Sequence, residues 1–478
     1  MTARRIGLFL GPLVFAITAF TSPPGGMGAE AWLVAGLVVW MASWWMTEAV
    51  PLSVTALLPF ICLPLGGVMP APDAASAYYA PILFLLLGGA FIALTIERTG
   101  LHKRLSLAIL RTIGTNGGQE RLLLAFMISA AILSMLISNT STALIMMPMA
   151  LAVIAGGAAA KETGDGAPIN TDGLAGALPM GIAFAASIGG LGTIVGSPTN
   201  GIAVQLLDDM IGLEISFATW MAYGLPVVLI GIPLAALIIS KVQRVSAHPF
   251  DLPAARAAID EQRSWSSAEK RLVPIIAVTF LFWMSRQWVA PYLPDKSWTD
   301  GTIAVLASVA LFLTPDGTGR PLLVWKEADR APWGVILMFG GGLALAAGMK
   351  ESGLAQWLGN ALLPLEAVPL ILMVFAIVAM VVLVTEFASN VATASAIIPV
   401  VASLAAALGL GEDAILIAMP AALAASWGFI LPAGTGPNAI AWATGRLTIG
   451  RLVRAGILLD LIGIMMMIGV VWAVASLN

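Results

Sequence analysis

The chain has 478 residues, of which 59% are hydrophobic and only 10% are charged, with a mean hydropathy of +0.96. Soluble globular proteins carry roughly 25% charged residues, so the composition excludes a soluble domain and indicates a polytopic membrane protein. The net charge of −3 excludes little. With one cysteine and two histidines, the chain cannot form an internal disulfide framework or an ordinary structural zinc site.

Apolar segments of about 20 residues, the length of a transmembrane helix, recur along the chain. They cover residues 6–22, 30–47, 52–69, 81–97, 218–240, 271–290, 301–314, 332–349 and 453–475. The first could pass for a signal peptide, but no convincing cleavage pattern follows and further spans come at once. We therefore interpret it as the first transmembrane helix.

Three other apolar regions, near 120–158, 175–207 and 367–445, are interrupted by Ser, Asn, Gly and Pro. The first predicts a re-entrant hairpin carrying Ser138-Asn139-Thr140. The second predicts a helix broken within 192–200. The third predicts another hairpin, carrying Ser389-Asn390-Val391, and then a helix broken within 431–438. Unsatisfied polar groups in hydrocarbon cost several kcal/mol each, so these side chains must bind something or one another.

The basic residues set the expected orientation. With the N-terminus in the cytoplasm and both hairpins returning to the side they enter from, all Lys and Arg residues fall inside except Lys296, Lys350 and Arg286, the last within a span. This positive-inside bias predicts a C-terminus outside and about eleven crossings plus the two hairpins. The expected class is an all-α polytopic protein of an inner (plasma) membrane, with the lipid bilayer as its surroundings.

Two halves of the sequence resemble each other. Residues 85–105 match 338–358, aligning Thr99-Gly100-Leu101 with Ser352-Gly353-Leu354, and the two broken helices match as well. Because 85–105 ends inside and 338–358 ends outside, the repeats are inverted, which is typical of alternating-access transporters. The charged segment 241–270 is interpreted as a solvated cytoplasmic linker between the halves, not as a nucleic-acid patch.

The residues at the hairpin tips could bind both an anion and a cation. Helix N-termini offer N–H groups and partial positive charge to an anion, whereas unwound carbonyls offer oxygens to a cation. Ser134, Ser138 and Asn139 could converge with carbonyls near Gly196 around a small hard cation. Thr385, Ser389 and Asn390 repeat that spacing, with Gly434 in the matching loop. No Lys or Arg lies in either motif, so an anion bound there would need bound cations for neutralisation.

Other polar residues in spans carry weaker expectations. An isolated Ser or Asn often only bonds a neighbouring helix, but two copies, each followed by a broken helix, favour a site. Glu48 is expected to cap a helix or to make a structural hydrogen bond. Glu386 either tunes cation binding or is structural. Asp460 and Arg286 are expected to pack or to pair.

Four stretches together resemble the divalent anion/sodium symporter family over nearly the whole chain. They are the paired SNT-type motifs, WWMTEAVPLSVTALLP (44–59), GTIVGSPTN (192–200) and TEFASNVATA (385–394). The resemblance implies a sodium-coupled carrier of dicarboxylates, citrate or sulfate that works as a homodimer by an elevator movement. It divides the chain into scaffold (1–112 and 271–358) and transport (113–240 and 359–478) parts around the linker.

The resemblance also implies site residues. One sodium site would comprise Ser134, Ser138, Asn139 and Gly196, and a second Thr385, Ala388, Asn390 and Gly434. The substrate would contact Asn139, Thr140, Pro198, Thr199, Ser389, Asn390 and Val391. Val391 stands where many relatives have threonine, which leaves the choice among C4 dicarboxylates, citrate and sulfate open.

Several rival functions remain in view. A sodium-independent dicarboxylate exchanger, or a sulfate symporter, could use the same fold. An enzyme is not expected, because the sequence offers no nucleophile with a base and no HExxH motif. A channel fits inverted broken helices less well than a carrier does.

Overall fold

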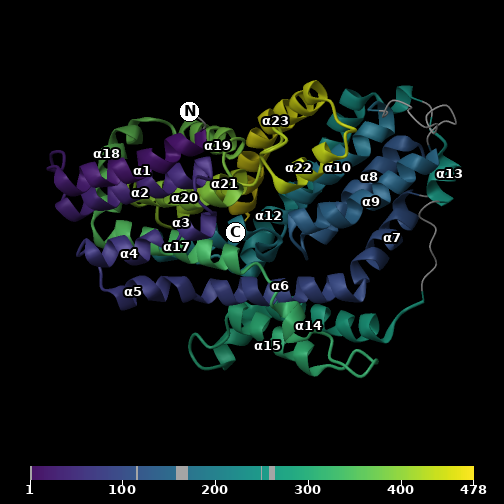
Figure 1. Ribbon diagram of the computed structural model, residues 1–478, viewed down its shortest axis with the longest axis horizontal. Helices are drawn as coiled ribbons and strands as arrows, with labels where there is room; N and C mark the ends of the chain where they lie inside the picture. Colours follow the sequence, from purple (N-terminus) through teal and green to yellow (C-terminus); the bar gives the residue numbers. More distant parts are fainter. Residues whose placement is uncertain (1–2, 115–116, 158–170, 249, 258–263, 478) are drawn as a thin grey trace.

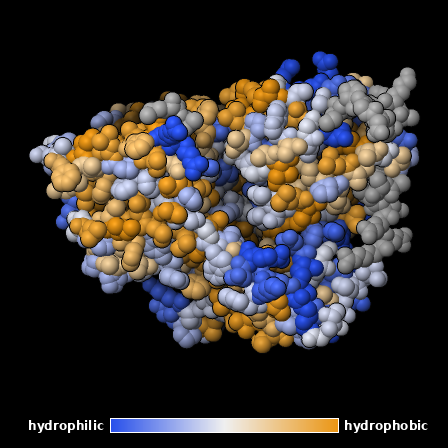
Figure 2. All heavy atoms as spheres, in the orientation of Figure 1, coloured by the Kyte–Doolittle hydropathy of each residue, from blue (hydrophilic) through white to orange (hydrophobic). Residues whose placement is uncertain are grey.

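The computed structural model describes residues 3–114, 117–157, 171–248, 250–257 and 264–477. Within these ranges the regular structure is helical, and the β structure is limited to an isolated bridge between Pro315 and Pro321. Nine of the described helices are long and apolar enough to cross a membrane. Apolar side chains cover much of the face seen in Figure 2. The expected all-α class is confirmed; the total of crossings and hairpins stays a prediction.

The helices of the first half follow the predicted segments closely, because an apolar chain without water must satisfy its backbone groups within helices. They are α1 (Ala3–Phe20), α2 (Ala29–Thr47), α3 (Leu52–Thr55), α4 (Leu58–Leu65), α5 (Ala71–Ser76), α6 (Pro81–Thr99), α7 (Leu101–Gly114), α8 (Gln119–Ser134), α9 (Asn139–Gly157), α10 (Gly173–Gly190), α11 (Pro198–Ile211) and α12 (Phe217–Gln243).

The linker and the second half supply the remaining helices. They are α13 (Leu252–Ala257), α14 (Ser267–Val289), α15 (Asp300–Leu313), α16 (Trp325–Ala328), α17 (Trp333–Glu351), α18 (Leu354–Leu362), α19 (Leu370–Thr385), α20 (Asn390–Ala407), α21 (Ile415–Ala424), α22 (Gly436–Ala443) and α23 (Ile449–Ala475). Residues 249 and 258–263 of the expected linker lie outside the described residues.

The predicted continuous span over 52–69 is wrong. The chain forms α3, leaves the helix at Ala56-Leu57 and resumes as α4, which ends at Leu65. Pro59 explains the break, because it lacks an N–H group and its ring would clash with the carbonyl four residues earlier, at Thr55, where α3 ends.

The helices form two masses above a long helix, α6, which α14 and α15 cover from below (Figure 1). One mass contains α1, α2, α17, α18 and α20, and the other contains α8, α9, α10, α12 and α22. Helix α10 is the centre of the second mass: every one of its residues is buried, and it packs against α8, α9, α12 and α22. Both hairpins and both broken helices meet where the two masses face each other.

The same order of local elements occurs twice. A long helix ends in a glycine and continues as a short helix: α6, Gly100 and α7 in one half, α17, Gly353 and α18 in the other. The two glycines share a left-handed backbone, with φ/ψ of 78°/13° and 75°/7°, which glycine adopts without steric cost. A helical hairpin, a broken helix and a long helix follow in each half.

Candidate ion and substrate site

Each hairpin turns at a four-residue tip whose last residue caps the second helix. The first tip joins α8 to α9, and the second joins α19 to α20. Ser138 Oγ accepts a hydrogen bond from the Ser141 N–H at 3.2 Å, and Ser389 Oγ accepts one from the Ala392 N–H at 3.2 Å. These serines therefore satisfy one of the N–H groups that a helix start leaves free.

Each broken helix is held open by an asparagine from the helix that follows. Asn200 Nδ2 donates to the carbonyls of Gly190 and Thr193, both at 2.8 Å. Asn438 Nδ2 donates to the Leu431 carbonyl at 3.2 Å and the Gly428 carbonyl at 3.5 Å. The side-chain amides thus replace the backbone donors that the unwound carbonyls have lost, which stabilises irregular backbone inside the protein.

Oxygen atoms gather behind the first tip. Ser134 Oγ lies 2.6 Å from Asn139 Oδ1 and donates to the Ala186 carbonyl at 2.6 Å. Gly196 comes close as well: a Cβ built on it would lie 2.9 Å from the Ser134 carbonyl oxygen. We define Ser134, Asn139, Ala186 and Gly196 as the first oxygen cluster.

The side-chain amide oxygen of Asn139 in this cluster faces acceptors, and the amide nitrogen faces donors. Turned over, its nitrogen would donate to the carbonyls of Ala186 and Gly196, at 3.1 and 3.2 Å, and to Ser134 Oγ at 2.6 Å. With the amide oxygen inward instead, this oxygen lies 2.6–3.2 Å from the oxygens of Ser134, Ala186 and Gly196. Such an arrangement is unfavourable without a positive charge at its centre, and hard cations prefer oxygen ligands of these kinds.

A second oxygen cluster lies behind the other tip, with the same contacts. Thr385 Oγ1 is 3.0 Å from Asn390 Oδ1 and donates to the Ala425 carbonyl at 2.8 Å. Thr385 is fully buried, as Ser134 is. Gly434 lies against this tip, where a Cβ would be 3.5 Å from the Glu386 carbonyl oxygen. We define Thr385, Asn390, Ala425 and Gly434 as the second oxygen cluster.

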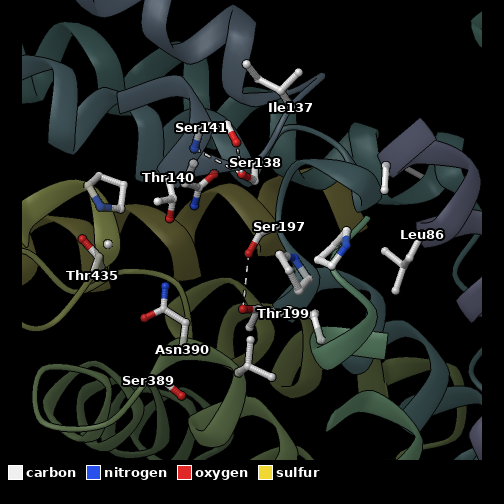
Figure 3. A pocket seen from close by; sticks show the side chains of 18 of the residues that line it. Leu86, Ile137, Ser138, Thr140, Ser141, Ser197, Thr199, Ser389, Asn390 and Thr435 are labelled. Carbon is white, nitrogen blue, oxygen red and sulfur yellow. Dashed lines mark hydrogen bonds between the residues drawn. The ribbon is translucent and has the colours of Figure 1, made fainter. Parts of the chain in front are cut away.

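A cavity of about 810 Å³ opens between the two tips. Its walls include all the residues expected to contact substrate: Asn139, Thr140, Pro198, Thr199, Ser389, Asn390 and Val391. Of the residues expected to bind sodium, Ser138, Asn139, Ala388, Asn390 and Gly434 line the cavity, while Ser134, Gly196 and Thr385 are buried behind it. Figure 3 shows Ser138, Thr140 and Ser141 facing Asn390 and Ser389 across the opening.

Two expected ligands place no side-chain oxygen in the oxygen clusters. The Ser138 hydroxyl contacts Ser141 Oγ at 3.0 Å and is not among the oxygens around Asn139. Ala388, by its nature, has only a carbonyl to offer. The spacing argument for Ser138 therefore places the residue correctly at the tip but does not place its hydroxyl in the first oxygen cluster.

Helix N-termini give the cavity partial positive charge, but few cationic side chains add to it. The helices α9, α20, α11 and α22 all begin at its wall, so that four N-termini with their partial positive charges face it. Among the described residues that line the cavity, Arg330 is the only cationic side chain, and it is exposed at the mouth with Glu48 and Glu97. The tips themselves carry no Lys or Arg that could neutralise a dianion.

Some lining residues were not singled out from the sequence. Ser141, Ser197, Thr435, Gly436 and Pro437 belong to the quoted motifs and could have been found by extending them. Gly436 allows a close approach, since a Cβ on it would lie 2.5 Å from Thr140 Oγ1. Glu48 belongs to the quoted stretch 44–59 and was expected only to cap a helix or to make a structural hydrogen bond. Glu97 and Arg330 lie outside the motifs, and no local pattern marks them. Glu48 is exposed and ends α2 in a left-handed conformation, so it caps that helix through its backbone.

Other polar residues of the spans have structural partners. Arg286 pairs with Asp300 at 3.2 Å, as expected. Glu386 is 3% exposed, and its two oxygens accept the N–H groups of Ile430 and Leu431, each at 2.9 Å. Glu386 therefore holds the second broken helix beside the second oxygen cluster.

Comparisons with known proteins give similarity over almost the entire chain. The sodium-dependent dicarboxylate transporter SdcS of Staphylococcus saprophyticus is 37% identical over 481 residues, covering 98% of this chain and 91% of its own. SdcS of Staphylococcus aureus (strain MRSA252) is 37% identical over 483 residues, with the same coverage.

Solved structures are similar in fold. The YdaH transporter of Alcanivorax borkumensis has a TM-score of 0.57 at 12% identity and covers 98% of both chains. MtrF of Neisseria gonorrhoeae has a TM-score of 0.54 at 13% identity, covering 98% of this chain and 94% of its own. Residues 3–476 match the family described as the sodium:sulfate symporter transmembrane region. The chain therefore belongs to the divalent anion/sodium symporter family.

Proposed function

We propose that the protein is a sodium-coupled symporter of dicarboxylates. The duplicated oxygen cluster carries this proposal: Ser134 with Asn139 and Thr385 with Asn390 make matching contacts at the two hairpin tips. The relatives named sodium-dependent dicarboxylate transporters support it. The protein is a carrier, not an enzyme, as its family is.

The geometry suggests why sodium and substrate would bind together. A dianion in the cavity meets four helix N-termini but no Lys or Arg at the tips. Each helix end supplies roughly half a positive charge that fades within a turn. Sodium ions in the two oxygen clusters would add full charges directly behind the tips. The substrate would contact Asn139, Thr140, Pro198, Thr199, Ser389, Asn390 and Val391, as the family resemblance implies.

The position of the cavity suggests how transport would proceed. One wall comes from the hairpins and broken helices of the proposed transport parts (113–240 and 359–478). The other comes from α2, α6 and α17 of the proposed scaffold (1–112 and 271–358), with 241–270 as the linker. In the orientation given by the basic residues, Glu48, Glu97 and Arg330 lie on the cytoplasmic side. The cavity is then open inward, and an elevator movement between inverted repeats in a homodimer would carry it across.

Two other functions share this geometry. A sodium-independent dicarboxylate exchanger would use the same cavity, but the retained oxygen clusters favour coupling. A symporter of sulfate or another divalent anion is favoured only by the family description. The cavity of about 810 Å³ suits a larger dianion, and the relatives of 37% identity are named for dicarboxylates.

Uptake of labelled succinate into proteoliposomes tests the proposal. We expect accumulation when an inward sodium gradient is imposed, and little uptake when choline replaces sodium. Sulfate and citrate serve as competitors. Equal uptake in sodium and in choline would favour the exchanger, whereas inhibition by sulfate alone would favour the sulfate symporter.

A further inference from the structure

The connection between α11 and α12 makes contacts that the proposed transport mechanism does not use. It spans only residues 212–216, and the helix ends on both sides of it are capped. Gly212, with φ of 69°, donates to the Asp208 carbonyl at 2.9 Å, and Ser216 Oγ accepts the Thr219 N–H at 3.1 Å. In the orientation given by the basic residues, the connection lies on the outer side, opposite the opening of the cavity. Because it is short and capped at both ends, it moves together with α11 and α12.

Lys350 binds the end of α11 from the proposed scaffold. It belongs to the last turn of α17, and its Nζ donates to the Asp209 carbonyl at 2.8 Å. This carbonyl is one of the four that the end of a helix leaves without an intrahelical partner. Helix C-termini carry partial negative charge, so the ammonium group stabilises the ends of α17 and α11 together. The contact joins the proposed scaffold (271–358) to the proposed transport part (113–240).

Asp300 makes the complementary contact at the start of α12. It is the first residue of α15 and is 7% exposed, and its Oδ2 accepts the N–H of Phe217, the first residue of α12, at 2.9 Å. Helix N-termini carry partial positive charge, so the carboxylate stabilises the starts of α15 and α12 together. Arg286 of α14 contacts the same oxygen at 3.2 Å and adds a full positive charge. The acid therefore lies where both helices favour an anion.

Aromatic packing shields the Asp300 contact from water. The Phe217 ring stacks on Trp283 of α14 with ring centroids 4.3 Å apart, and Phe280 meets Phe217 edge to face. Phe217 and Trp283 are fully buried, and Trp283 Nε1 donates to the Asp300 carbonyl at 3.1 Å. Hydrogen bonds to charged groups are stronger where water is excluded. The Asp300 contact is therefore the stronger of the two, and the contact of the exposed Lys350 is the weaker.

Helix α11 connects these contacts to the ion and substrate site. Its first residue, Pro198, lines the cavity two residues after Gly196 of the first oxygen cluster, and its 14 residues span roughly 20 Å. An elevator movement toward the outer side would displace α11 and α12 relative to α14, α15 and α17. Both contacts would then have to break, because they join helices that move to helices that stay.

We propose that Lys350 and Asp300 form an outer clasp that holds the connection 212–216 against the scaffold and stabilises the inward-open arrangement. Each charge matches the helix ends that it touches: the cation lies between two C-termini, and the anion lies between two N-termini. The two residues belong to different scaffold helices, so the clasp holds the transport part at two points. This inference rests on the proposed function, because it requires that the two parts move relative to each other.

Distances between two spin labels on the purified full-length protein, measured without sodium or substrate, test the clasp. One label is attached at Glu214→Cys in the connection, and the other at Tyr292→Cys, a scaffold residue that is 88% exposed. Cys62→Ala removes the native cysteine. Singly labelled proteins identify any distances between two copies of the chain. With the clasp intact, the two labels should give one main distance.

Loss of either charge should add a second distance. Lys350→Met should raise the ratio of the second to the first population about threefold, as expected for an exposed charge. Asp300→Asn keeps an acceptor for the Phe217 N–H but loses the buried charge, so the ratio should rise by about tenfold. Lys350→Arg keeps both the charge and a donor, and Glu351→Gln removes the exposed charge next to Lys350, so both should keep the single main distance.

An unchanged distribution in both Lys350→Met and Asp300→Asn would overturn the proposal, as would an equal change in Glu351→Gln. Lys350 is exposed, so Lys350→Met tests the clasp even if Asp300→Asn fails to fold. Sodium-independent uptake by the unmodified protein would refute the proposed function, whereas the distances, measured without sodium, would still decide whether the clasp holds the two parts together.

Discussion

Gly190→Ala should disable the first oxygen cluster without changing any of its ligands. Gly190 is the last residue of α10, and its backbone conformation accepts alanine. A Cβ there would lie 3.0 Å from both Cγ and Nδ2 of Asn139, and closer still to Oδ1. The nearest three atoms all belong to the end of this one side chain, which can swing away. The substitution therefore displaces the Asn139 amide and little else.

Gly190→Ala should change the stability of the fold much less than it changes sodium binding. A displaced Asn139 side chain costs about 0.5–1.5 kcal/mol in rotamer strain, which the better helix propensity of alanine, up to about 1 kcal/mol, largely offsets. Removing an oxygen from a bound cation should cost about 1.5–3 kcal/mol, by analogy with hydrogen bonds to charged groups. That cost corresponds to roughly 10- to 150-fold weaker sodium binding.

Sodium activation of succinate uptake in proteoliposomes measures the effect, with thermal unfolding of the purified protein as the check on folding. Gly469→Ala on α23 is the matched control, since nothing lies within 4 Å of a Cβ there. Gly428→Ala, in the second half, should have a milder effect, because its Cβ would meet Thr385 Cγ2 at 3.1 Å. Normal sodium activation in Gly190→Ala would refute the assignment of Asn139 to a sodium site.

Three further changes have defined outcomes. Val391→Thr adds a donor at the cavity wall worth about 1 kcal/mol, so competition assays should show a several-fold change in the ratio of succinate to citrate uptake, with sodium dependence intact; an unchanged ratio would mean that Val391 does not face the anion. Arg330→Ala removes the exposed cation at the cavity mouth, so the apparent substrate affinity should fall several-fold at low ionic strength and little at high salt; a salt-independent loss would indicate direct contact. Burial alone would raise the pKa of Asp316, but hydrogen bonds from Thr318 and Arg98 outweigh it and lower the pKa from 3.8 to about 2. The stabilisation by Asp316 is thus complete above its unfolded value and is lost as the pH falls from about 4 toward 2, so the thermal midpoint should drop less steeply over this range in Asp316→Asn; parallel curves would contradict the assignment.

Much of the architecture could be predicted because the bilayer leaves few options for an apolar chain. Uncharged runs of spanning length become helices, and the interrupted runs became hairpins and broken helices at the predicted places. The break between α3 and α4 was not predicted, although Pro59 indicates it. The length of the apolar segment was given more weight than the effect of a proline on the preceding helical turn.

The site could be predicted only where its residues are close in sequence. The SN motifs and the loops before Pro198 and Pro437 are local, and the cavity contains them. Glu97 and Arg330 reach the cavity mouth from segments far apart in the chain, so only the packing of the helices reveals them.

The central claim is that sodium assembles the anion site, and calorimetry of the purified protein tests it most directly. Linkage requires that sodium tighten succinate binding and that succinate tighten sodium binding by the same factor. We expect succinate affinity at least tenfold higher in sodium than in choline, and a matching increase in sodium affinity at saturating succinate. Equal succinate affinity in the two salts would contradict the claim.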